Sequence, residues 1–201
     1  MKILKYLLYA ILLLIVLFFA AGLFTSSISY GYQIEVDKPV EEAWAVSHDE
    51  SKYADWLKGF TSLELLEGEK FAVGSKYKVV VTPYEGKPGF EMIETITSIK
   101  ENDHITMEFD SDYNKFIQTI TFSEDEGTTT VKTDSKVLGN GIMYRSLYAT
   151  MHMLGDVFTK QEAENLENLK VLIQENTTDY FPEPVELDSI PAVPEEMTEE
   201  G

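Results

Sequence analysis

The sequence predicts an α+β fold in which a curved antiparallel sheet of about seven strands wraps around a long C-terminal helix. In the run from 142 to 175, apolar residues recur mostly at steps of three and four, as they do on one face of a helix. Short alternating segments with turn-like connectors precede this run, and strands joined so tightly pair antiparallel. At roughly 1.5 Å per residue the helix would be about 50 Å long, so it needs a broad surface to lie against.

An apolar segment lies near the start of the chain. Residues 6–24 carry no charge, and as a helix they would rise about 28 Å, close to the hydrocarbon thickness of a bilayer. Lys2 and Lys5 flank the segment on its N-terminal side, and the next charged residue is Glu35. The positive-inside rule then predicts a single-pass membrane protein with a cytoplasmic N-terminus and an extracytoplasmic domain. The alternative is a signal peptide cleaved near 20–22, which would release a secreted protein.

The elements of the folded domain are expected to follow a polar hinge at 26–29. A strand at 30–36 leads to Pro39, which suits the first turn of a helix, and Asp49 suits the N-cap of a second short helix. Six further strands are expected at 62–67, 76–82, 90–99, 105–109, 115–122 and 128–137. A turn-rich loop at 83–89 separates the second of these from the third. Within the long helix, Gly155 is a weak point that permits a bend.

Three segments follow from this pattern: an anchor and hinge at 1–28, one folded domain at 29–180, and a tail at 181–201. The tail contains four prolines and seven acidic residues but no basic residue, so we expect it to be disordered. A solvated end is favoured over a segment that binds a partner.

Composition excludes several classes of function. Sixteen Lys and Arg residues against 35 Asp and Glu give a net charge of -19, which argues against nucleic-acid binding and against docking on anionic lipid by charge alone. The absence of cysteine excludes disulfides, thiolate metal sites and cysteine nucleophiles. Asp110 and Asp112 resemble part of a calcium loop, but the remaining ligands and the glycine are missing. No cofactor or metal is therefore expected.

Two stretches carry a resemblance to a known family. YQIEVDKPVEEAWAVSHDESKYADWLKGF, followed by LELLEGEKFAVGSKYKV, is similar to the N-terminal signature of the SRPBCC superfamily, especially its START-like and polyketide cyclase/dehydrase-like members. ENLENLKVLI resembles the closing helix of that superfamily. Asp49, Tyr53, Leu169 and Lys170 also match the pattern of the superfamily, and five matching positions are best interpreted as structural: Pro39, Trp44, Trp56, Gly68 and Gly74.

The resemblance covers about residues 29–176 and implies a helix-grip fold, with a hydrophobic cavity between the sheet and the C-terminal helix. Members of the superfamily bind lipids, sterols, polyketides or other apolar molecules, and a minority catalyse cyclisation or dehydration. They share no universal catalytic motif. Most relatives lack an anchor, so the apolar segment at 6–24 sets this chain apart and puts a cytosolic role in doubt.

The cavity would be lined by inward-facing strand residues and by the first half of the long helix, 144–158, where we place the site. The same residues would leave no cavity if they filled the core completely. The candidate ligand-binding residues are Trp56, Tyr77, Val79, Met92, Met107, Phe109, Ile120, Tyr144, Leu147, Tyr148, Met151, His152, Leu154 and Phe158.

The leading hypothesis is a membrane-tethered domain that binds a hydrophobic or amphipathic small molecule, such as a lipid. A cyclase or dehydratase acting in the same cavity is the first alternative, and a ligand-free protein-interaction module is the second. No catalytic residue is assigned. His48 and His104 are expected to be exposed, and His152 would need a partner within hydrogen-bonding reach to act as an acid or base.

Overall fold

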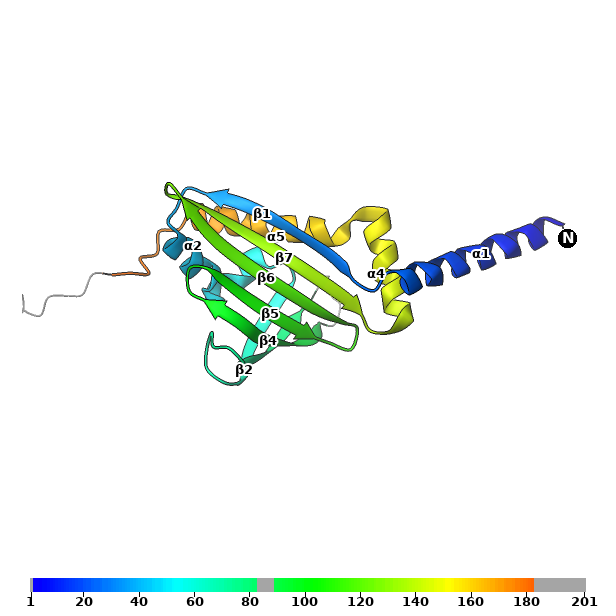
Figure 1. The fold of residues 1–201 in the computed structure, drawn as a ribbon, viewed down its shortest axis with the longest axis horizontal. Coiled ribbons are helices and arrows are strands. Elements are labelled where there is room, and N and C mark those ends of the chain that lie inside the picture. The colour runs from blue at the N-terminus through cyan, green and yellow to red at the C-terminus, as the bar shows by residue number, and fades with distance from the viewer. Residues whose placement is uncertain (1, 83–88, 183–201) are drawn as a thin grey trace, which may run out of the picture.

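A computed structural model describes residues 2–82 and 89–182 and confirms the predicted fold class (Figure 1). One seven-stranded antiparallel sheet has the order β1-β7-β6-β5-β4-β3-β2, so the first and last strands of the domain are neighbours. The strands are β1 Ile28–Val36, β2 Phe60–Glu67, β3 Lys76–Val81, β4 Phe90–Lys100, β5 His104–Asp110, β6 Asn114–Asp125 and β7 Thr128–Gly139.

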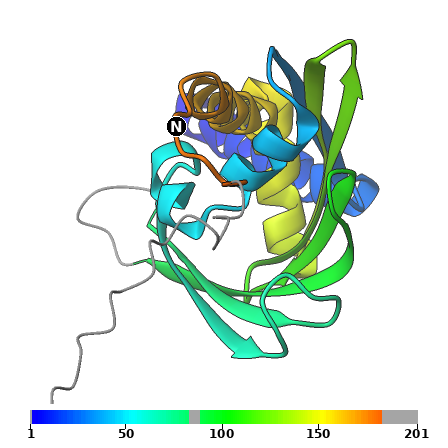
Figure 2. The ribbon, with the colours of Figure 1, turned by 90° about the vertical axis from the view of Figure 1, so that its left-hand side faces the viewer.

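The sheet is strongly curved, and its concave face encloses the helices (Figure 2). Register shifts interrupt the pairing of β2 with β3 and of β4 with β5, the latter between Ile96 and Ser98. Such bulges increase the local twist and bend the strand that carries them. The alternation of side chains then sends one face of every strand inward, where Ile96, Ile105 and Val131 are buried.

Three short helices close one side of the hollow: α2 Val40–Ser47, η1 Glu50–Lys52 and α3 Tyr53–Trp56. Pro39 stands at the N-cap of α2, and Asp49 caps η1 by accepting a hydrogen bond from Ser51 N at 3.0 Å. Trp44 and Val46 of α2 are buried in the core. These helices therefore lie where the sequence predicts them.

The expected continuous helix from 142 to 175 is wrong, because the segment forms two helices, α4 Gly141–Gly155 and α5 Val157–Gln174. The break is at Asp156, one residue beyond the predicted weak point, where φ is +48°. The Asp156 carboxylate accepts a hydrogen bond from Thr159 Oγ1 at 2.8 Å in the first turn of α5. After the break, α5 lies in the hollow of the sheet with Leu166, Leu169 and Ile173 at most 1% exposed.

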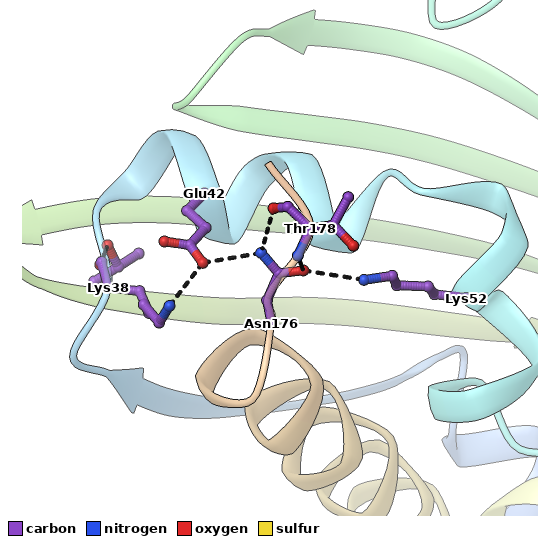
Figure 3. Close-up of polar contacts among 6 residues, drawn as sticks. Lys38, Glu42, Lys52, Asn176 and Thr178 are labelled. Atoms are coloured by element: carbon purple, nitrogen blue, oxygen red, sulfur yellow. Dashed lines mark hydrogen bonds and ion pairs between the residues drawn. The ribbon is translucent and has the colours of Figure 1, made fainter. Parts of the chain in front are cut away.

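The α5 helix ends in a polar junction centred on Asn176 (Figure 3). Its amide Nδ2 donates to Glu42 Oε1 and to the Thr178 carbonyl, both at 3.0 Å. Its Oδ1 accepts from Lys52 Nζ at 3.2 Å and from Thr178 N at 3.2 Å. One side chain thus ties the end of α5 to α2 and η1. Residues 183–201 of the expected tail and residues 83–88 of the expected loop lie outside the described residues.

The apolar N-terminal segment forms α1, Lys2–Phe24, which projects from one end of the domain (Figure 1). Among the described residues it is the one helix long and apolar enough to cross a membrane, a test that a signal sequence also passes. Only its last turns touch the domain. Gly22 is buried against α4, and a Cβ at this position would lie 2.8 Å from Ser146 Cα.

Candidate functional site: a cavity between the sheet and α5

A cavity of about 270 Å³ lies between the concave face of the sheet, α3 and α5. The core is therefore not completely filled. Seven of the candidate ligand-binding residues line it: Trp56, Tyr77, Val79, Met92, Met107, Phe109 and Ile120. Trp56 lies on α3, and the other six lie on β3 to β6 with their side chains on the concave face of the sheet.

The other seven candidates lie outside the cavity lining, and all of them come from the C-terminal helical segment: Tyr144, Leu147, Tyr148, Met151, His152, Leu154 and Phe158. The break at Asp156 accounts for the six residues on α4, because it turns α4 away from the sheet and onto α1. Leu154 is 84% exposed. Phe158 lies nearest to the cavity, since its ring stacks on the lining residue Tyr30 at 5.4 Å.

The helical wall of the cavity is instead formed by α5, through Gln161, Glu162, Asn165 and Leu166. The helical lining of this cavity therefore comes from α5 and not from residues 144–158, where the sequence pattern predicts the site. The apolar periodicity alone does not reveal the break, because both halves of the segment have a helical period and the helix that packs on α4 lies more than 100 residues earlier in the chain.

Glu94 is the most unusual residue on the cavity wall. It lies on β4 between Phe109 of β5 and Tyr77 of β3, which are its cross-strand partners. None of the described residues forms a hydrogen bond or an ion pair with its carboxylate. Burial alone raises the pKa of Glu94 to about 7, compared with an ordinary value of 4.5. A carboxyl group that is half protonated near neutral pH can either donate or accept a hydrogen bond.

The indole of Trp56 is a second polar group without a partner. Its Nε1 is buried and forms no hydrogen bond within the described part of the chain. Tyr53, on the same helix, also lines the cavity, and burial and the charge of Glu94 both raise the pKa of its phenol. The apolar wall therefore contains a carboxyl acceptor and an indole donor that the protein does not satisfy.

Glu162, by contrast, is well satisfied. Its Oε1 accepts a hydrogen bond from Gln118 Nε2 at 2.7 Å, and Gln118 also donates to Ser135 Oγ at 3.2 Å. Burial raises the pKa of Glu162, and hydrogen bonds from Thr133, Gln118 and Ser135 lower it in part. This network joins α5 to β6 and β7, so we assign Glu162 a structural role rather than a chemical one.

His48 was expected to be exposed, but it lines the cavity. Its ring stacks on Trp44 at 4.0 Å, and its Nδ1 lies 2.9 Å from the Trp44 carbonyl oxygen. Burial lowers the pKa of His48 to about 4, so the ring is neutral at physiological pH. The neutral ring donates from Nδ1, which leaves Nε2 as an acceptor. His104 was also expected to be exposed, but it is half-buried and its ring nitrogens form hydrogen bonds with Asp103 and Ser98.

The cavity reaches the surface beside Lys58, which lines it and has a half-exposed side chain. Lys58 Nζ forms an ion pair with Glu164 of α5 at 2.6 Å, and Lys58 N donates to Asn165 Oδ1 at 3.1 Å. These two contacts connect the chain after α3 with α5. An ion pair between half-exposed side chains contributes little to stability.

The chemistry of the lining indicates no metal centre. No group of three or more His, Asp or Glu residues with the geometry of a metal site occurs in residues 2–82 and 89–182. Among the ionisable groups of the lining, burial raises the pKa of Glu94 to about 7 and lowers the pKa of His48 to about 4.

Residues 27–172 match the protein family described as polyketide cyclase / dehydrase and lipid transport. The chain belongs to this family. The match confirms the resemblance to the SRPBCC superfamily and spans β1 through most of α5. No curated protein sequence matches the chain.

Solved structures similar to this member of the polyketide cyclase/dehydrase family support the fold. A conserved protein from Geobacillus kaustophilus has 21% identity and a TM-score of 0.56, over 73% of this chain and 95% of that one. Norcoclaurine synthase from Thalictrum flavum has 13% identity and a TM-score of 0.53, over 75% and 95%. The di-domain ARO/CYC protein BexL has 13% identity and a TM-score of 0.55, over 77% of this chain and 52% of that one. At these identities the similarity establishes the fold alone.

Proposed function

We propose that this protein binds a compact amphipathic molecule in the cavity beneath α5, while α1 tethers the domain to a membrane. One observation carries the proposal: the apolar cavity is lined by the carboxyl of Glu94, to which the described residues supply no hydrogen bond, and by Trp56, whose indole N–H is buried without a partner. Such groups are costly to bury without a partner, and a ligand that pairs with them recovers that cost. The ligand would therefore combine a hydrophobic body with a hydrogen-bond donor and an acceptor.

The size of the cavity limits the ligand. Its volume of about 270 Å³ is near the lower end of the range of small-molecule sites, which is about 300–1,000 Å³. One ring system or one acyl chain fits this volume better than a phospholipid with two chains. Met92 and Met107, both on the wall, would allow the cavity to adapt to the ligand's shape.

The packing of α1 supports a retained anchor over a cleaved signal peptide. Gly22 is buried against α4, and Ser146 and Ala149 of α4 are at most 2% exposed. Cleavage near 20–22 would remove the helix that packs beside these residues. Lys2 and Lys5 before the apolar segment favour a cytoplasmic N-terminus and an extracytoplasmic domain.

The test is ligand capture by the full chain. Delipidated protein is equilibrated with a mixed lipid extract and examined by native mass spectrometry. Val79→Phe adds volume inside the cavity and should reduce capture, whereas Val80→Phe places the same side chain on the opposite face of β3 and should not. Failure of the unaltered protein to retain any apolar molecule would contradict the proposal.

Glu94 also favours a second candidate, acid–base catalysis within the cavity. A carboxyl with a pKa of about 7 can exchange a proton with a bound substrate near neutral pH. This candidate predicts that Glu94→Gln abolishes turnover of a captured molecule but preserves its capture. Binding alone predicts weaker capture and no chemical change in either protein. The ligand-free interaction module gains no support from the cavity.

A further inference from the structure

Helix α4 exposes an apolar stripe that the folded domain leaves uncovered. Met143, Leu147 and Leu154 follow one another at steps of four and seven residues and so lie on one face of the helix. They are 55%, 42% and 84% exposed, respectively. The residues that fix α4 in place, Ser146 and Ala149, lie on a different face.

The position of α4 relates this stripe to the end of α1. Ser146 packs against Gly22, and Gly22 lies two residues before the end of α1, a rise of only about 3 Å. Figure 1 shows α1 leaving the domain along its long axis, with α4 crossing at the base of α1. The last residues of α1, Leu23 and Phe24, are 73% and 89% exposed. The exposed end of the anchor and the exposed stripe of α4 therefore lie at the same end of the domain.

The α4 helix differs from the rest of the domain in its charged residues. Residues 141–155 contain no acidic residue, although the chain has 35 of them and a net charge of -19. Arg145 is the single Lys or Arg of the helix. At the same end of the domain, Tyr113 is 42% exposed and packs edge-on against Tyr144 of α4, with ring centroids 5.5 Å apart. Tyrosine and arginine beside an apolar stripe are typical of the membrane–water interface.

We propose that α4 is an interfacial helix whose stripe of Met143, Leu147 and Leu154 inserts into the bilayer leaflet where α1 emerges. This inference rests on the proposed membrane anchor and adds a second contact with lipid. Helices of this kind bury their apolar face about 5–10 Å deep, at the boundary between headgroups and acyl chains. With α1 and α4 both fixed to the bilayer, the orientation of the sheet and its cavity relative to the membrane would also be fixed.

The lack of cysteine makes the test clean, because each single-cysteine variant has one labelling site. Full-length Leu154→Cys, Leu12→Cys and Val171→Cys are labelled with an environment-sensitive fluorophore and reconstituted in phosphatidylcholine vesicles. The lipids carry a quencher near the headgroup end of the acyl chain in one set of vesicles and near its methyl end in another, so that labels at the interface and at the bilayer centre are both detected. Leu12, 57% exposed, reports on the anchor. Val171 is the matched control, since it is an apolar residue of α5 with 49% exposure.

Quenching of the labels at both 12 and 154, with the label at 171 unaffected, is the expected result. Quenching at 12 without quenching at 154 overturns the interfacial helix but leaves the anchor intact. Absence of quenching at 12 shows instead that the anchor itself is wrong. A label at 154 that resists quenching and transfers energy to a label on a second copy would show that α4 covers another protein chain, which also overturns the inference.

Discussion

Replacing Glu94 by glutamine should stabilise the ligand-free protein, and only above acidic pH. The pKa of Glu94 in the folded state is about 7, compared with an ordinary value of 4.5. Below pH 4.5 the carboxyl is protonated in both folded and unfolded chains. Between these two pH values the unfolded chain releases the proton while the folded chain retains it, so the free energy of unfolding falls as pH rises.

The size of this loss follows from the difference between the two pKa values. Each pKa unit corresponds to about 1.4 kcal/mol, so the loss reaches about 3 kcal/mol above pH 7. Glutamine is close in shape and does not titrate. Glu94→Gln should therefore match the unaltered protein at pH 4 and exceed its stability at pH 8 by up to about 3 kcal/mol. For a chain of this size the melting temperature would rise by about 6–12 °C.

The assay is thermal unfolding of the full chain in phosphatidylcholine nanodiscs, followed by the fluorescence of Trp44 and Trp56, which are both in the core. Glu108→Gln is the matched control, because Glu108 is exposed on the neighbouring strand β5. The difference between variant and parent is plotted against pH, which cancels the titration of all other groups. A difference for Glu94→Gln that stays constant from pH 4 to pH 8 would refute the claim that the cavity holds this carboxyl protonated.

Three further predictions concern packing. Leu169→Ala should lower the free energy of unfolding by about 2–5 kcal/mol because Leu169 is fully buried in α5, whereas the exposed Val171→Ala should cost less than about 0.5 kcal/mol in the same denaturant titration. Asn176→Ala removes the junction between α5, α2 and η1 and should cost about 1–2 kcal/mol by the same measurement, and an unchanged midpoint would show that water replaces the amide. Gly22→Leu should separate α1 from α4, because even a Cβ at Gly22 would lie 2.8 Å from an α4 backbone atom. Trypsin should then cleave faster after Arg145 while the melting of the sheet is unchanged, and equal cleavage rates would contradict the close packing.

The sheet could be predicted because it depends on sequence features that are local to each strand and each connector. Alternation in β3 to β6 determines which side chains point inward, and the tight connectors determine the antiparallel order. The break between α4 and α5 is different, since it depends on which surface each half of the segment packs against. Ser146 and Ala149 carried a usable signal, because small residues three positions apart on a helix permit close packing of a second helix.

The polar residues of the site could be predicted from the sequence only in part. Glu94 occupies the same phase of β4 as Phe90, Met92 and Ile96, so the alternation already directed it inward. Its acidic character is more typical of a surface residue, so a search for apolar inward-facing positions does not select it. His48 offered no such signal. It is enclosed by Trp44, four residues earlier on α2, and by Phe71, which long-range folding brings to the end of that helix.

The central claim is that the cavity beneath α5 holds an apolar molecule, and Trp56 can report on this directly. Trp56 lines the cavity, whereas Trp44 packs behind it against His48. In Trp44→Phe, titration with a brominated single-chain fatty acid should quench the remaining tryptophan saturably, and in Trp56→Phe it should not. Equal quenching of the two variants, or quenching that never saturates, would contradict a ligand seated in the cavity.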